Sequence, residues 1–189
     1  MIGRYEMNNK QSVQLNAVRS AKEIARTAVF VAMVIGAQYA FSAVPFVEIV
    51  TLLFVCYAYV FGVARGVVST VAFALLRQLL FGFYPVVLML YLAHFSLLSV
   101  VFGVLGKYGK RTGWKRLALV VAVAVACTVC FTLLDNVLTP MYYGYSERAA
   151  KMYFRASLPF MVGQSVCVSV SVGTMFIPLT KALFFIKKA

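Results

Sequence analysis

Residues 45–83 read PFVEIVTLLFVCYAYVFGVARGVVSTVAFALLRQLLFGF and carry only three charged side chains, Glu48, Arg65 and Arg77. The glycines at positions 62 and 66 divide the stretch into two apolar runs. Neither run alternates polar and apolar residues with a period of two, which disfavours β-strands. The stretch therefore predicts two helices in an apolar medium, joined by a tight connection.

The composition of the whole chain indicates the same medium. Of the 189 residues, 63% are hydrophobic and 12% are charged, and the mean hydropathy is +0.91. A soluble domain of this composition would expose too much apolar surface, so we expect lipid around the protein. The net charge of +13 does not indicate nucleic acid binding, because the basic residues recur between apolar runs, as in segments that flank a membrane.

Six candidate membrane spans follow one another along the chain. They cover roughly residues 24–44, 47–64, 66–82, 85–105, 117–138 and 158–180. A helix needs about 20 residues to cross about 30 Å of hydrocarbon, so the second and third spans are marginal, and Pro178 is expected to end or kink the sixth. We expect an all-α integral membrane protein with six transmembrane helices in one compact bundle. A polar cytoplasmic lead would occupy residues 1–23, and the transmembrane domain would occupy residues 24–189.

The distribution of Lys and Arg predicts the orientation, because cytoplasmic segments carry an excess of both. With six crossings, the N-terminal lead, Arg65, the loop around residues 107–116 and the C-terminal end share one side. Together they hold fourteen of the eighteen basic residues, and the opposite loops hold Arg148, Lys151 and Arg155. Both termini are therefore expected in the cytoplasm.

Several polar side chains fall in the outer half of the expected bundle. Charge at such depth is costly unless it faces the bundle interior or water, so an outward-facing ligand cavity would account for them. The candidates are Gln38, Glu48, Arg77, Asp135, Asn136 and Gln164. The aromatic segment MYYGYSERAAKMYF, residues 141–154, would roof this cavity with Tyr142 and Tyr143, whose rings suit a ring-bearing ligand with polar edges.

These candidates also have simpler interpretations. Glu48 could complement the dipole at the N-terminus of the second helix. Arg77 could form a structural ion pair with Asp135 or Glu48. Asp135 and Asn136 could end the fifth helix before Pro140.

Residues typical of catalysis are few. Cys127 and Cys130 form a C-x-x-C pair, which in a thiol oxidoreductase supplies the attacking and resolving sulfurs, but an apolar mid-span setting favours cysteine as a small hydrophobic residue. His94 is the one histidine, and we interpret it as a packing residue. No metal site, cofactor or enzymatic activity is expected. The sequence has no glycine-rich phosphate loop, so the chain is not expected to power transport with ATP itself.

Small residues recur every fourth position in the first span, at Ala28, Ala32, Gly36 and Ala40. Such a stripe lets another helix approach closely, and close packing drives helix association in lipid. A comparable row in the sixth span holds Ser165, Ser169 and Gly173. Internal packing is the simplest use of one stripe, and two stripes leave room for an external partner.

The chain resembles a known family in its length, its six spans, its inferred orientation and two stretches of its sequence. The stretches are ARTAVFVAMVIGAQYA, residues 25–40, and the segment 45–83 quoted above. The chain resembles the S component of an energy-coupling factor (ECF) transporter over residues 24–186. The resemblance implies a multi-pass protein of the bacterial cell membrane that binds a vitamin or related micronutrient in an outer cavity roofed by loops. It also implies that Ala28, Ala32 and Gly36 dock on a membrane T subunit, which couples to two ATPases.

Two other classes of function stay open on the sequence. A structural or assembly subunit of a larger membrane complex would use the small stripes as its interface. A membrane thiol oxidoreductase would depend on Cys127 and Cys130.

Overall fold

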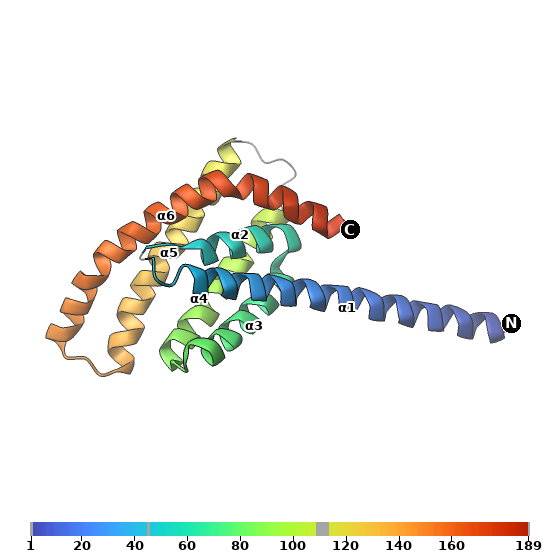
Figure 1. Ribbon diagram of the computed structural model, residues 1–189, viewed down its shortest axis with the longest axis horizontal. Coiled ribbons are helices and arrows are strands. Elements are labelled where there is room, and N and C mark those ends of the chain that lie inside the picture. Colours follow the sequence, from blue (N-terminus) through green and yellow to red (C-terminus); the bar gives the residue numbers. More distant parts are fainter. Residues whose placement is uncertain (1, 45, 109–113, 189) are drawn as a thin grey trace.

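The computed structural model describes residues 2–44, 46–108 and 114–188, and this part of the chain contains six α-helices and no β-strand (Figure 1). The helices are α1 (Ile2–Ala40), α2 (Ile49–Phe61), α3 (Val63–Phe81), α4 (Pro85–Lys107), α5 (Trp114–Tyr142) and α6 (Glu147–Lys188). The all-α prediction is confirmed. Four of these helices, α3, α4, α5 and α6, are long and apolar enough to cross a membrane. They indicate a membrane-embedded protein, whereas the count of six crossings stays a prediction.

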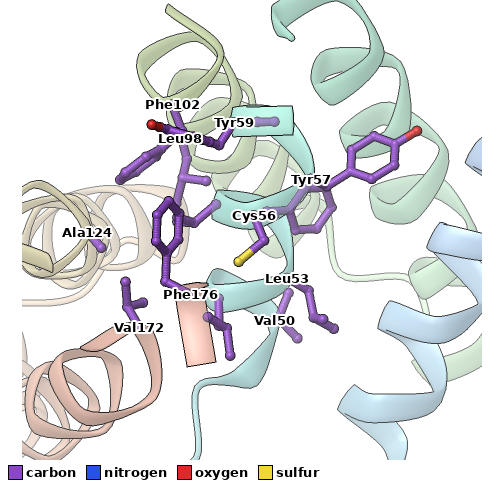
Figure 2. Packing of buried hydrophobic residues seen from close by; sticks show 14 of the residues in the cluster. Val50, Leu53, Cys56, Tyr57, Tyr59, Leu98, Phe102, Ala124, Val172 and Phe176 are labelled. Carbon is purple, nitrogen blue, oxygen red and sulfur yellow. The ribbon is translucent and has the colours of Figure 1, made fainter. Parts of the chain in front are cut away.

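Helix α2 lies at the centre of the bundle and is buried along almost its whole length. Residues 50–61 are all buried, with neighbours on the other five helices. Figure 2 shows side chains that surround α2: Leu98 and Phe102 of α4, Ala124 of α5, and Val172 and Phe176 of α6. At 1.5 Å per residue, the 13 residues of α2 extend about 20 Å, less than the roughly 30 Å of a bilayer core. Helix α2 is therefore a core helix that its neighbours shield from lipid.

Two short connections set the directions of the central helices. Gly62 joins α2 to α3 with φ = 90°, a conformation that glycine adopts without a steric penalty. Gly82, at φ = 97°, begins the turn between α3 and α4. The Tyr84 N–H in that turn donates to Gln78 Oε1 at 2.8 Å, and Pro85 occupies the first helical position of α4. A tight joint was expected from Gly62 to Gly66; the structure has it at Gly62, and Gly66 lies inside α3.

Helix α4 approaches the α2–α3 joint very closely because it carries glycine there. A Cβ atom at Gly103 would lie 2.6 Å from the backbone nitrogen of Val63, and one at Gly106 would overlap the carbonyl group of Tyr59. No larger residue fits at this distance, so these glycines determine how near the two helices come.

The alternative interpretation that Asp135 and Asn136 end the fifth helix is wrong, because α5 runs through Pro140 to Tyr142. Helix α6 continues past Pro178 to Lys188, so Pro178 does not end it. A proline removes one backbone hydrogen bond and commonly bends a helix without ending it when neighbouring helices hold both halves. Figure 1 shows that α6, which also contains Pro159, is bent along its length.

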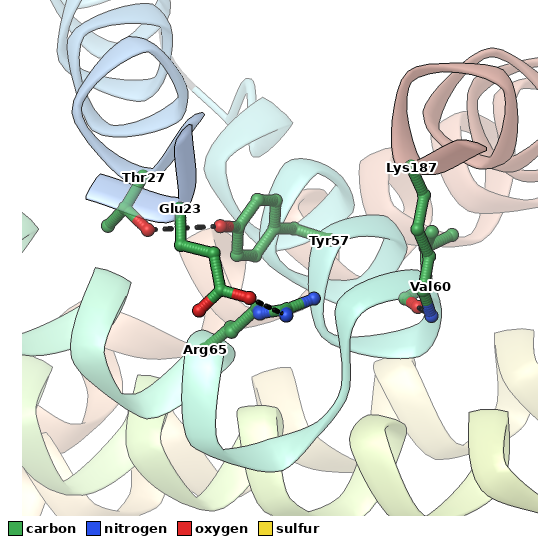
Figure 3. A network of polar contacts seen from close by, with 6 residues as sticks. All are labelled: Glu23, Thr27, Tyr57, Val60, Arg65 and Lys187. Carbon is green, nitrogen blue, oxygen red and sulfur yellow. Dashed lines mark hydrogen bonds and ion pairs between the residues drawn. The ribbon is translucent and has the colours of Figure 1, made fainter. Parts of the chain in front are cut away.

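The two chain ends drawn in Figure 1 lie on the same side of the molecule, opposite the turn that joins α5 to α6. Helix α1 begins at Ile2, so the polar lead is helical and extends from the bundle on the side of the chain ends. Near that side Arg65 of α3 forms an ion pair with Glu23 of α1 (Figure 3). The side of the membrane on which the two chain ends lie stays a prediction.

The C-terminal end of α2 is held by the last turn of α6. Lys187 Nζ donates to the carbonyl oxygen of Val60 at 2.5 Å (Figure 3). The last carbonyl groups of a helix have no partner within the helix and carry partial negative charge. A cation from α6 therefore satisfies one of the free carbonyl groups at the end of the buried helix.

Candidate ligand-binding site

A cavity of about 360 Å³ lies between α5 and α6. Ligand pockets commonly have volumes of about 300–1,000 Å³, so this one has room for a small molecule. Three of its lining residues come from α5 and five from α6: Phe131, Thr132 and Asp135, and Tyr153, Ala156, Ser157, Phe160 and Gln164. Three of these side chains are aromatic, and the others include a carboxylate, an amide and two hydroxyl groups.

Asp135 carries the charge in this cavity and is held by hydroxyl groups. Tyr153 Oη of α6 donates to Asp135 Oδ2 at 2.7 Å, and Thr139 Oγ1, one turn further along α5, donates to Oδ1 at 2.5 Å. The ion pairs formed within the described ranges do not include Asp135. The carboxylate is therefore oriented by two neutral donors, and lone pairs on both oxygens are left for a ligand.

Asn136 and Gln164, also predicted site residues, lie near this carboxylate. Gln164 lines the cavity directly. Asn136 Nδ2 donates to Ser157 Oγ at 2.7 Å, while Asn136 Oδ1 is buried and has no hydrogen-bond partner among the described residues. The hydrogen bond ties α5 to α6 beside the cavity, since Ser157 belongs to the cavity wall.

Gln38 and Arg77 lie in a second cluster, around Tyr91 of α4. Gln38 Nε2 donates to Tyr91 Oη at 3.3 Å, and the Arg77 guanidinium carbon lies 4.6 Å from the centre of the Tyr91 ring and 5.4 Å from that of Phe81. Arg77 therefore makes cation–π contacts. It takes part in neither ion pair of the described ranges, so the ion pair with Asp135 or Glu48 considered above is not formed.

Glu48 combines features of both interpretations proposed for it. It precedes the first residue of α2, and its Oε2 accepts a hydrogen bond from Thr51 Oγ1 at 2.9 Å. It also lines a cavity with Tyr91, His94 and Phe131, but this cavity has a volume of only about 10 Å³, room for one water molecule. The wall residue Phe131 belongs to both cavities.

Tyr142 is the last residue of α5 and Tyr143 begins the turn to α6, and both are exposed. Ring contacts run from Tyr142 to Tyr143, from Tyr143 to Tyr145 and from Tyr145 to Tyr153, with centroid distances of 5.2, 6.2 and 6.0 Å. The two predicted roof residues are therefore connected to the cavity by a chain of aromatic rings. The chain ends at Tyr153, which donates a hydrogen bond to Asp135.

Sequence reasoning omitted several wall residues, notably Phe131, Thr132, Ser157 and Phe160. For the α6 residues the sequence does contain a signal that would have identified them. The wall positions 153, 157, 160 and 164 are separated by four, three and four residues. This period puts all of them on one face of a helix. Tyr153 was expected in a roofing loop, but it belongs to this helical face.

The small residues of the first helix lie on its outer surface. Ala28, Ala32 and Gly36 are exposed, and an added Cβ at Gly36 would meet no atom within 4 Å. The buried face of α1 carries Phe30 and Val34 instead. The stripe is therefore not used for packing within the described part of the chain.

The C-x-x-C cysteines lie near the middle of α5. Cys127 is half-buried, Cys130 is exposed, and both are free. Within the described residues no group of three or more His, Cys, Asp or Glu side chains could hold a metal ion.

The side chains around the α5–α6 cavity are suited to reversible binding of a small organic molecule by hydrogen bonds and ring contacts. No family model, curated protein or solved structure matches this chain.

Proposed function

We propose that the protein is the substrate-binding subunit, or S component, of an ECF-type importer in the bacterial cell membrane. One observation carries the proposal: a cavity of about 360 Å³ between two helices that are long enough to span a membrane, with aromatic walls, a carboxylate and an amide. Such a mixture of apolar walls and a few polar groups is typical of small-molecule sites. The ligand would be a vitamin or related micronutrient, captured from outside a six-span bundle whose termini are cytoplasmic.

The energy for uptake would come from partner proteins. The exposed small stripe of Ala28, Ala32 and Gly36 supports close packing with a helix of another membrane protein. In the proposed assembly this protein is a T subunit, which transmits the work of two ATP-binding subunits. The S component itself would have no enzymatic activity.

The binding step can be tested on the isolated protein. The chain is purified in lipid nanodiscs, and any molecule that accompanies it is identified by mass spectrometry after denaturation. We expect a stoichiometric small molecule in the unmodified protein and its loss in Ala156→Trp, which fills the cavity. Val170→Trp is the matched control, because it introduces the same side chain at an exposed position of the same helix outside the cavity.

A ligand that stays bound in folded Ala156→Trp would reject the α5–α6 cavity as the site. Absence of any ligand after growth in rich medium, together with a stable complex with other membrane proteins, would favour the structural or assembly subunit instead.

A further inference from the structure

We propose that the cavity between α5 and α6 selects a positively charged ligand that carries a cationic nitrogen close to a flat ring. This inference rests on the proposed function and adds the charge and shape of the ligand. The cation would contact the Asp135 carboxylate, and the ring would lie between the aromatic walls.

The charge of the cavity wall is the first reason. Among the eight wall residues Asp135 is the one carboxylic acid, and none is Lys or Arg. Its two hydrogen-bond donors, Tyr153 and Thr139, are neutral. An uncompensated carboxylate in a membrane-embedded protein is costly, and a cationic N–H group would offset that cost through a charge-assisted hydrogen bond.

The basic residues on α6 near the α5–α6 cavity do not line it. Arg148, Lys151 and Arg155 lie along the exposed first turns of α6 and line a different cavity, and Lys151 is paired with Glu147. Arg77 contacts the rings of Tyr91 and Phe81. Among the described side chains, therefore, no cation lines the α5–α6 cavity.

The aromatic walls are the second reason. Phe131 of α5 and Tyr153 and Phe160 of α6 present three rings to a cavity of about 360 Å³. Aromatic faces attract cations as well as other rings. The wall residue Gln164 supplies an amide that can donate to or accept from polar edges of the same ligand.

Two probes of matched shape separate charge from ring. The first is 4-fluorobenzylammonium, and the second is the neutral 4-fluorobenzyl alcohol. Each is titrated into nanodiscs of zwitterionic lipid that contain the full chain, and binding is followed by fluorine NMR, with empty nanodiscs as the reference for partition into lipid. We expect the ammonium to bind at least about tenfold more tightly than the alcohol, a difference of about 1.4 kcal/mol.

Three variants assign this preference to the cavity. Asp135→Asn keeps the shape and removes the charge, so the preference should fall to about twofold or less. Gln164→Lys adds a compensating cation and should remove ammonium binding while the alcohol still binds, which provides a second test if Asp135→Asn does not fold. Glu147→Gln removes an acid of α6 that does not line this cavity and should leave the preference unchanged.

The outcomes distinguish this inference from the proposed function. Equal binding of both probes, each lost in Ala156→Trp, would overturn the charge selectivity and keep the cavity as a binding site. An ammonium preference that persists in Asp135→Asn and Gln164→Lys would also overturn it. If Ala156→Trp affects neither probe, both the inference and the assignment of the site are wrong.

Discussion

Glu48 and Asp135 are two carboxylates in an apolar chain, and the space beside them differs. The cavity beside Glu48 has room for one water molecule. The Glu48 carboxylate accepts a hydrogen bond from the hydroxyl group of Thr51, in the first turn of α2. Asp135 faces a cavity of about 360 Å³ and accepts two hydroxyl donors. A helix-end role therefore suits the first, and a ligand contact suits the second.

The substitution Glu48→Gln tests the first role. Glutamine keeps the size of the side chain and can still accept a hydrogen bond from Thr51, while its loss of charge weakens the interaction with the helix dipole. We expect the free energy of unfolding to fall by less than about 1 kcal/mol, measured by denaturation in detergent. Ligand affinity, measured by titration, should change by less than about twofold. A tenfold loss of affinity in a folded Glu48→Gln protein would instead make Glu48 part of the ligand site.

The sequence alone does not predict which of the polar side chains contact one another. Hydropathy and position within a span give an expected depth for Gln38, Glu48, Arg77 and Asp135, because each helix advances a fixed distance per residue, and this depth stays a prediction. The rotation and packing partners of each helix decide which of them meet, and these depend on contacts between distant segments. The predicted polar group therefore divides into two clusters, one around Tyr91 and one around Asp135.

At the scale of elements, the close approach of α4 to the α2–α3 joint depends on glycine. Gly103 brings α4 against the start of α3, and a Cβ there would lie 2.6 Å from the Val63 nitrogen. The marginal length of residues 47–64 was visible in the sequence, but the burial of α2 on all sides was not, since apolar residues face lipid and protein alike. The sequence also did not show that α5 runs through Pro140, or whether Pro178 ends or bends α6, because neighbouring helices can stabilise a helix on both sides of a proline.

The substitution Gly103→Ala tests this approach. The added methyl group forces the two backbones apart, so we expect a loss of about 1–3 kcal/mol in the free energy of unfolding and a lower thermal midpoint. Gly36→Ala is the matched control, because its methyl group would meet no atom within 4 Å. It should leave stability unchanged or raise it by up to about 1 kcal/mol, through the higher helix propensity of alanine. Equal effects of the two substitutions would contradict the packing argument.

The outer stripe of α1 provides the second prediction at this scale. Ala28→Trp and Ala32→Trp add bulk to a face that no described part of the chain covers, so the isolated protein should fold and bind ligand normally. Uptake of labelled ligand by cells that contain the complete transporter should fall at least about tenfold, because a bulky side chain prevents close helix approach. Val170→Trp on α6 serves as the control. Undiminished uptake in both alanine variants would reject α1 as the docking face.

At the scale of the whole molecule, the chain ends lie on one side and the α5–α6 turn lies on the other. The excess of Lys and Arg predicts that the first side is cytoplasmic. The basic residues and the helix arrangement are independent observations, and they are compatible with one topology.

Cysteine labelling in intact cells tests this topology. In a background without the four native cysteines, Tyr145→Cys should react with a membrane-impermeant maleimide added from outside. Trp114→Cys should react only after the membrane is permeabilised. Both positions are exposed in the structure, so a difference in labelling reports the side of the membrane. Labelling of Trp114→Cys in intact cells would reverse or reject the proposed orientation.

The bond between Lys187 and Val60 has a consequence for how the protein is made. These residues are 127 positions apart, so the ribosome completes α2 long before it produces the side chain that satisfies the Val60 carbonyl group. During that interval α2, which at about 20 Å is shorter than the bilayer core, has neither this cation nor the α6 side chains that pack against it. Until α6 is made, α2 would therefore need either contact with the insertion machinery or a local thinning of the bilayer around it. Biogenesis of this protein would reach its final packed state only when α6 arrives, and a truncation within α6 would be recognised by membrane quality control as an unfinished core.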